Sequence, residues 1–291
     1  MASVSIVSPM SKTRIDIRDQ LLKGLDRPTW IVPDIITRGK IITLAAEAGT
    51  GKSILAYHLA VAVAAGAPFL GIPATPGSVL YFDEENAEDE RLKYLRDIIV
   101  GMDLSTDSDW LNNLIFHDGA FREANDKWDA MLDHYLKLHQ PHLVVIDTAA
   151  SAFPLRGENA ENDNSQATEI IKKIRKVRNS ASPTSTILIL AHGKPDKDGH
   201  VMNRGASAWR GASDAWWKLT KVKSISGEDV SLEDNLHETR LSHGKARAWS
   251  FRGSIRLRPF YLKDGRGIGS KRISGIRFGP DREKLHSYEE R

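Results

Sequence analysis

An apolar run, a glycine-rich turn and the start of a helix-forming segment follow one another in Ile41-Ile42-Thr43-Leu44-Ala45-Ala46-Glu47-Ala48-Gly49-Thr50-Gly51-Lys52-Ser53-Ile54. Glycines at 49 and 51 allow consecutive backbone N–H groups to point inward around a phosphate, and the helix that follows directs its positive end at the same anion. Lys52 would reach the terminal phosphates, and the Ser53 hydroxyl is a hard oxygen ligand that suits Mg²⁺. We therefore expect ATP and Mg²⁺ to bind at Ala48, Gly49, Thr50, Gly51, Lys52, Ser53 and Ile54.

Ala46 departs from the usual pattern of a phosphate-binding loop, which has a glycine at this position. Ala46 stands at the strand exit and bears less on the phosphates than Gly51 does. The alternative interpretation is a glycine-rich turn with a chance Gly-Lys-Ser. The apolar run before the turn and the helical pattern after it favour the phosphate loop.

The composition limits the classes to which the chain can belong. It has 291 residues with 41% hydrophobic content, and its evenly spread apolar runs favour one main domain with extensions. It has no cysteine, which excludes disulfides, thiolate zinc sites and cysteine nucleophiles. No apolar run approaches the roughly 20 residues that span a bilayer, and residues 1–12 lack the layout of a secretory signal. We expect a cytoplasmic protein that does not contact a membrane.

The charge is distributed unevenly along the chain. The net charge is +3, but residues 239–291 hold 14 Lys and Arg against 5 Asp and Glu, so the C-terminal part is the basic part. Such a segment either contacts nucleic acid or forms a solvated surface, and charge alone leaves both open.

From residue 30 onward, short apolar runs alternate with longer amphipathic stretches, which is typical of a parallel sheet with crossover helices. We expect an α/β protein with a mostly parallel, twisted sheet flanked by helices. Strands are expected at 40–46, 78–83, 114–117, 142–147 and 185–191. Helices are expected near 52–65, 87–101, 121–138 and 165–179.

After residue 209 the pattern changes to β-like runs at 214–223, 237–243, 247–258 and 272–278. Antiparallel strands added to the sheet toward the C-terminus explain this change. We divide the chain into an N-terminal arm (1–28), a nucleotide-binding domain (29–260) and a basic C-terminal tail (261–291).

Asp147 is a candidate metal-site residue because it ends the apolar run Leu143-Val144-Val145-Ile146. A carboxylate that ends a strand is more often a cap than a magnesium partner. In a chain with a phosphate loop, however, the carboxyl end of a strand places an acid beside the Mg²⁺. We expect Asp147 and Ser53 to form the metal site, Asp147 through a bound water.

Three successive acids, Asp83, Glu84 and Glu85, end the strand that follows the phosphate-loop helix. Hydrolysis of a terminal phosphate needs a group that orients the attacking water, and a carboxylate at the mouth of a neighbouring strand can provide it. Glu85 is the first candidate and Glu84 the second. The alternative is a solvated first turn of the next helix, where Glu is favoured.

His192 ends the buried run Thr186-Ile187-Leu188-Ile189-Leu190-Ala191. A lone histidine at a strand end is usually a structural residue. Beside the other three motifs, it fits a residue that touches the γ-phosphate and reports its loss.

This set of motifs resembles the RecA-like P-loop ATPases, and within them the small hexameric helicases of plasmid RepA type. The resemblance extends from about residue 25 to 260 and rests on the phosphate loop, Val79 to Glu85, Asp147-Thr148 and Leu190-Ala191-His192. It implies that Glu85 is the catalytic glutamate. No acid follows Asp147, where other P-loop enzymes keep that glutamate, and this supports the assignment.

The resemblance further implies a homo-oligomeric, hexameric ring in which each subunit sends a positive finger into the nucleotide site of its neighbour. Lys245 and Arg247 match the late strand of the family that bears such fingers, and Arg210 is a rival. An Arg on a strand is ordinarily a surface residue, so the choice among them stays open.

In RecA-like rings, the loops after the catalytic strands face a central channel and grip single-stranded DNA. Here these loops are 149–165 and 193–207. The second holds Lys194, Lys197 and Arg204, which suit phosphate contacts that do not read sequence. A flexible lid is the alternative for such loops.

Three functions remain open at this point. The first is a ring helicase or translocase that works with other replication proteins on a plasmid, phage or integrated element. The second is a recombination or strand-annealing ATPase, and the third is a KaiC-like regulatory ATPase with protein partners. A small-molecule kinase is less consistent with the sequence, because no arginine-rich lid is recognisable.

Overall fold

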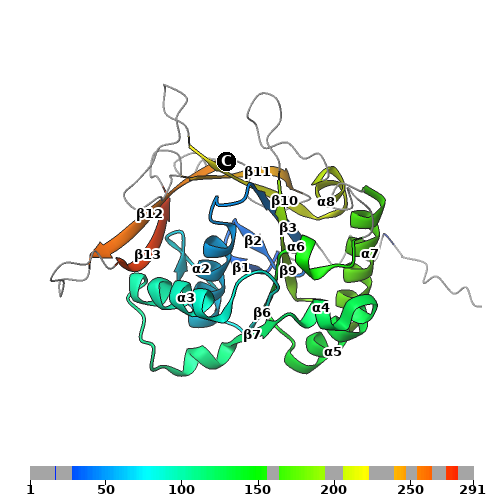
Figure 1. Ribbon diagram of the computed structural model, residues 1–291, viewed down its shortest axis with the longest axis horizontal. Coiled ribbons are helices and arrows are strands. Elements are labelled where there is room, and N and C mark those ends of the chain that lie inside the picture. Colours follow the sequence, from blue (N-terminus) through cyan, green and yellow to red (C-terminus); the bar gives the residue numbers. More distant parts are fainter. Residues whose placement is uncertain are drawn as a thin grey trace, which may run out of the picture.

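The computed structural model describes residue 17 and residues 28–155, 164–193, 206–222, 239–246, 254–263 and 273–280. Within these residues, nine strands form one sheet. Its order from edge to edge is β13 (Ile273–Pro280), β12 (Ser254–Lys263), β11 (Thr239–Ala246), β10 (Ala215–Lys221), β3 (Ile41–Ala46), β9 (Thr186–His192), β8 (Leu143–Asp147), β6 (Val79–Asp83) and β7 (Leu114–Asp118). A strongly twisted sheet thus forms the centre of the molecule (Figure 1).

The sheet has a parallel part and an antiparallel part. The strands from β10 to β7 are parallel, whereas β11, β12 and β13 join through antiparallel pairs. Strands β3, β6 and β8 are buried along their whole length, as expected for parallel strands that are covered on two faces. The mostly parallel α/β sheet with antiparallel C-terminal strands, predicted from the alternation of apolar runs, is therefore confirmed.

Helices cover the two faces of the sheet and enclose two separate cores. On one face lie α2 (Lys52–Ala65) and α3 (Glu88–Gly101) (Figure 1). The helices of the other face are α4 (Ala120–Ala124), α5 (Trp128–His139), α6 (Ala149–Ala152), α7 (Asn164–Ala181) and α8 (Ala206–Ala212). The antiparallel end of the sheet curves so that β13 lies beside α3.

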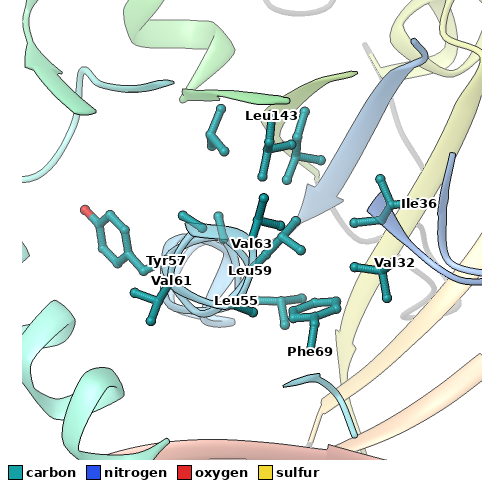
Figure 2. Close-up of a cluster of buried hydrophobic side chains, with 14 of the residues drawn as sticks. Val32, Ile36, Leu55, Tyr57, Leu59, Val61, Val63, Phe69 and Leu143 are labelled. Carbon is teal, nitrogen blue, oxygen red and sulfur yellow. The ribbon is translucent and has the colours of Figure 1, made fainter. Parts of the chain in front are cut away.

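Helix α2, which begins in the phosphate loop, is buried on nearly all sides because it is apolar around most of its circumference. Figure 2 shows Leu55 and Leu59 of this helix packed against Val32, Ile36 and Phe69. Full burial of each such side chain stabilises the fold by about 1.5–3 kcal/mol. The helix that carries Lys52 and Ser53 is therefore fixed rigidly against the sheet.

The short elements complete this packing. A hairpin of β1 (Trp30–Val32) and β2 (Ile36–Thr37) and a second of β4 (Pro68–Phe69) and β5 (Ile72–Pro73) provide the partners of α2. Two 3₁₀ helices, η1 (Asp109–Asn113) and η2 (Asn125–Lys127), lie in the connections. All of these elements are too short to produce a recognisable period in the sequence.

Most predicted elements agree with the structure to within about two residues, but the single helix expected at 121–138 is wrong. The chain forms α4, η2 and α5 there, and the break falls at Asn125, whose φ of 47° is incompatible with a continuous right-handed helix. The strand expected at 247–258 runs from 254 to 263 in the described residues. The expected domain boundary at residue 260 falls inside β12, and β13 continues the same sheet.

Candidate nucleotide-binding site

The candidate site lies at the edge of the sheet where the parallel strands end. The phosphate loop follows β3, and His192, Asp147 and Asp83 end β9, β8 and β6. Ala46 is paired with His192, and Asp83 is paired with Asp147. Since β9 lies between β3 and β8, His192 is held between the phosphate loop and Asp147. The topology thus collects these four sequence motifs at one edge of the sheet.

Backbone conformation explains the glycines of the phosphate loop. Gly49 has a φ of 69° and Gly51 a φ of 90°, values that side-chain-bearing residues rarely adopt. Apart from the glycine and its two chain neighbours, no heavy atom lies within 4 Å of where a Cβ would stand at Gly49 or Gly51, so the loop backbone borders open space that a phosphate can enter. Ala46 is an extended, buried residue of β3, a conformation that alanine adopts freely. The alanine is therefore compatible with the loop.

Lys52 is only 6% exposed, although it carries the amine expected to bind phosphate. Burial lowers its pKa, while the carboxylates of Glu85 and Asp147 act in the opposite direction. Its Nζ lies 3.4 Å from Nδ1 of His192. The amine is thus directed into the site and surrounded by groups of the other candidate motifs.

Asp147 has the properties expected of a metal-site acid. It is fully buried; its Oδ2 accepts a 2.8 Å hydrogen bond from the Tyr81 hydroxyl, and its Oδ1 has no hydrogen-bond partner. Burial raises the pKa of Asp147 to about 7, opposed by the hydroxyls of Tyr81 and Ser53. A buried carboxylate oxygen without a partner is costly unless a cation or a proton occupies it.

These observations fit a Mg²⁺ ion beside Asp147 and Ser53. Among the described residues, no group of three His, Asp or Glu side chains could hold a metal ion. Mg²⁺ in phosphate-binding sites usually takes one or two protein ligands and completes its shell with water and phosphate oxygens. Two protein groups, Ser53 and Asp147, are therefore compatible with a magnesium–nucleotide complex.

The three successive acids at the end of β6, Asp83, Glu84 and Glu85, have different environments. Asp83 is buried and accepts hydrogen bonds from Tyr57 and from Asn86. Glu84 is also buried, and it accepts from the backbone N–H groups of Phe121 and Arg122 at the start of α4. Burial raises the pKa of Glu84, opposed by these backbone hydrogen bonds. Asp83 and Glu84 are thus occupied by the protein itself.

Glu85 is the acid of this group that faces the site. Its side chain is 41% exposed, and its Oε2 lies 3.7 Å from Nε2 of His192. His192 in turn neighbours Lys52, so one imidazole lies between the candidate water-orienting acid and the candidate phosphate-binding amine. This geometry favours Glu85 over Glu84 for the catalytic role.

The candidate fingers lie elsewhere on the sheet. Lys245 of β11 is paired with Trp216, which is paired with Thr43, three residues before the end of β3. Its Nζ donates to the carbonyl oxygens of Arg210 and Gly211 at 2.9 and 2.5 Å, at the end of α8. The Arg210 guanidinium lies over the Trp216 ring, 5.4 Å from its centre. Lys245 and Arg210 are therefore directed away from the phosphate loop.

Several predicted residues lie outside the described part of the chain. These are Arg247, the DNA-contact candidates Lys194, Lys197 and Arg204, and the N-terminal arm apart from residues 17 and 28. Their roles stay predictions.

With this geometry established, one comparison decides the family. A family model described as "AAA domain" matches residues 10–197. The chain belongs to this AAA domain family. It is therefore a nucleotide-binding protein of the P-loop ATPases. No curated protein matches the chain.

The AAA domain match covers the strands of the candidate site, from β3 to β9, and it ends before α8 and the antiparallel strands. The phosphate loop, Glu85, Asp147 and His192 all lie within it. Lys245 and Arg210 lie beyond it. No helix in the described part of this AAA domain protein has the length and apolarity to cross a membrane.

Sequence reasoning missed the aromatic residues behind the acids. Tyr57 of α2 and Tyr81 of β6 stack with ring centres 5.0 Å apart, and their hydroxyls bond to Asp83 and Asp147 respectively. Burial raises the pKa of each tyrosine, so both hydroxyls stay protonated donors. The local sequence around these acids indicated at most a turn closed by the side chain of Asp83 onto Asn86, and it gave no indication of the two tyrosines.

Proposed function

We propose that this AAA domain protein is an ATP-dependent, ring-forming DNA helicase or translocase of the RepA type, acting on single-stranded DNA in the replication of a plasmid, phage or integrated element. The observation that carries the proposal is the assembly of Lys52, His192 and Glu85 at one edge of the sheet. The acid of this group, Glu85, stands two residues after the end of β6, and no acid follows Asp147 at the end of β8. That arrangement is the one expected from the resemblance to the RecA-like helicases.

Each side chain has a role in ATP hydrolysis that follows from its environment. Lys52 stabilises negative charge on the terminal phosphates, in a buried site where such an interaction is stronger than in water. Glu85, which is half exposed and close to the phosphate-binding amine, orients the attacking water and accepts its proton. Ser53 and Asp147 would hold Mg²⁺, which would supply charge neutralisation at the phosphates.

His192 provides a route from the nucleotide to the DNA. It contacts both Lys52 and Glu85, and the next residue, Gly193, donates a backbone hydrogen bond to Ala46. The chain then enters residues 194–205, which hold the candidate DNA contacts Lys194, Lys197 and Arg204. A change in the partners of His192 on hydrolysis would therefore act at the first residue of this loop.

The position of the candidate fingers supports action between subunits. Strands rise about 3.3 Å per residue, so Lys245, level with Thr43, lies about 10 Å along the sheet from the end of β3. Its side chain also points to the end of α8. A phosphate-contacting role for Lys245 therefore requires the site of a neighbouring subunit, as a ring provides.

Directional strand displacement tests the proposal against its alternatives. A tailed DNA duplex with a single 5′ or 3′ overhang should be unwound with ATP and Mg²⁺, from one of the two overhangs only. Lys52→Ala is the matched control and should unwind neither. ATP hydrolysis that single-stranded DNA stimulates without unwinding would favour the recombination or annealing ATPase. A rate of ATP hydrolysis that does not change when DNA is added would favour a regulatory ATPase with protein partners.

A further inference from the structure

The carboxylate of Asp83 is the centre of a buried hydrogen-bond network behind Glu85. Its Oδ1 accepts from the backbone N–H and the side-chain amide of Asn86, at 3.0 and 3.1 Å. The Glu85 N–H approaches the same oxygen at 3.4 Å. Its Oδ2 accepts from the Tyr57 hydroxyl and lies 3.7 Å from Nη1 of Arg91. Asp83 is thus saturated by protein partners, in contrast to Asp147 on the next strand.

Tyr57 connects this network to the phosphate-loop helix. It follows Ser53 by four residues on α2, so the two side chains share one face of the helix. The ring is fully buried, while Figure 2 shows the hydroxyl pointing away from the other labelled side chains of the apolar cluster. The hydroxyl also accepts a 3.0 Å hydrogen bond from the Asn86 amide. A phenylalanine would fill the same space without this link.

We propose that Tyr57 and Asn86 are positioning residues for hydrolysis: through Asp83 they fix the turn that carries Glu85 relative to the phosphate-loop helix. The proposal rests on the proposed ATPase function and deepens it. The turn is also held at Glu84, whose N–H donates to the Asp147 carbonyl oxygen at 2.7 Å. From this turn the Glu85 carboxylate reaches His192, at 3.7 Å, and interacts through charge with Lys52 and Asp147. Its orientation therefore depends on the backbone of the turn, which the network holds.

The physical reason for an effect on rate is geometric. A water-orienting carboxylate acts only within hydrogen-bond reach of the attacking water, and displacements of about 1 Å can reduce a rate about 100-fold. Nucleotide affinity depends mainly on the loop backbone and Lys52, which the network does not contact. Loss of the Tyr57 hydroxyl should therefore lower kcat and leave KM unchanged.

The test uses steady-state ATP hydrolysis by the full chain with Tyr57→Phe and Asn86→Ala. We expect each to lower kcat about tenfold or more, with KM for ATP within about twofold of wild type. Tyr94→Phe is the matched control, because Tyr94 stacks on the Tyr57 ring at 6.4 Å and takes no part in the network. It should retain wild-type kcat. Thermal unfolding and fluorescent-nucleotide binding show that each variant is folded and loaded.

A double-mutant cycle separates positioning from general destabilisation. If Tyr57 acts only through Glu85, adding Tyr57→Phe to Glu85→Gln should cause no further loss of kcat. Additive losses, or wild-type kcat in both Tyr57→Phe and Asn86→Ala, would overturn the inference while leaving the ATPase function intact. If Tyr57→Phe fails to fold, the cycle that combines Asn86→Ala with Glu85→Gln gives the same test of kcat, because Asn86 is only half buried. Absence of hydrolysis by wild type would overturn the proposed function and this inference with it.

Discussion

The imidazole of His192 lies 3.7 Å from the carboxylate of Glu85, although 107 positions separate the two residues in the sequence. The same ring lies 3.4 Å from the amine of Lys52. The site thus places one histidine between the candidate water-orienting acid and the candidate phosphate-binding amine. A terminal phosphate entering the site would compete with His192 for Lys52 and with Glu85 for His192, which makes this histidine suited to report the state of the nucleotide.

The two glutamates of the acidic turn should respond differently to removal of their charge. Glu85→Gln should retain ATP binding and reduce kcat about 10²–10⁴-fold, because it removes the group that orients water. Glu84→Gln should keep most of kcat and lose about 1 kcal/mol of unfolding free energy, because Glu84 caps α4. Hydrolysis rates and chemical denaturation of both variants check this. Normal hydrolysis by Glu85→Gln would refute its assignment.

Removal of the Lys52 amine should abolish tight nucleotide binding. A charge-assisted contact to phosphate contributes about 1.5–3 kcal/mol, so Lys52→Ala should weaken ATP affinity about 10–150-fold. Lys93→Ala, which removes an exposed lysine of α3, is the control and should bind normally. Titration with a fluorescent ATP analogue measures both. Equal affinity in the two variants would contradict the phosphate-loop assignment.

Asp147 should make the stability of the nucleotide-free protein depend on pH. Its pKa is about 7 in the fold against 3.8 unperturbed, so the folded state binds the extra proton between these values. Stability from this group is present below about pH 4 and is lost as the pH rises through about 7. Asp147→Asn should therefore stabilise the protein at pH 8, by up to roughly 4 kcal/mol, and have little effect at pH 4.

Thermal unfolding at pH 4, 6 and 8 without nucleotide measures this dependence. Added Mg²⁺ with ATP should raise the unfolding temperature of the wild-type protein at pH 8. It should raise the unfolding temperature of Asp147→Asn less, because the ion requires the ionised carboxylate. A stability difference between the two proteins that is the same at all three pH values would show that folding does not raise the pKa of Asp147.

A finger that acts between subunits can be detected by mixing two inactive proteins. Lys52→Ala lacks a working phosphate loop but keeps Lys245, and Lys245→Ala has the opposite defect. Random mixing around a closed ring should restore about a quarter of wild-type hydrolysis, because one interface in four joins an intact loop to an intact finger. Mixing Lys52→Ala with Glu85→Gln should restore nothing, since the two defects lie in the same site. Equal failure of the two mixtures would exclude Lys245 as the finger.

The fold could be predicted largely from sequence because buried parallel strands are continuous apolar runs. Strands β3, β6, β8 and β9 were expected within about one residue for this reason. The break at Asn125 could not be predicted, because an asparagine inside an amphipathic stretch does not by itself indicate a φ of 47°. The start of α4 is fixed by Glu84, a residue 36 positions before it, which no local pattern shows either. Helix α8 was missed as well, since seven residues give no clear helical period.

The parts of the candidate site that a short local motif defines could be predicted from the sequence, whereas contacts between distant segments could not. The phosphate loop is local, and the ends of parallel strands necessarily share one edge, so Asp147 and His192 could be placed near it. The sequence ranked Glu85 ahead of Glu84, but it did not show that the start of the distant α4 occupies the carboxylate of Glu84. The link from Tyr57 to Asp83 spans 26 residues and two elements, so no local pattern indicated it.

The most direct measurement is steady-state ATP hydrolysis by the purified protein with Mg²⁺, in the presence and absence of single-stranded DNA, with Lys52→Ala as control. Our account predicts hydrolysis that Lys52→Ala lacks and that DNA stimulates about tenfold or more, a coupling typical of linked binding sites. Robust hydrolysis at the same rate with and without DNA would contradict the helicase proposal and would indicate a regulatory ATPase instead.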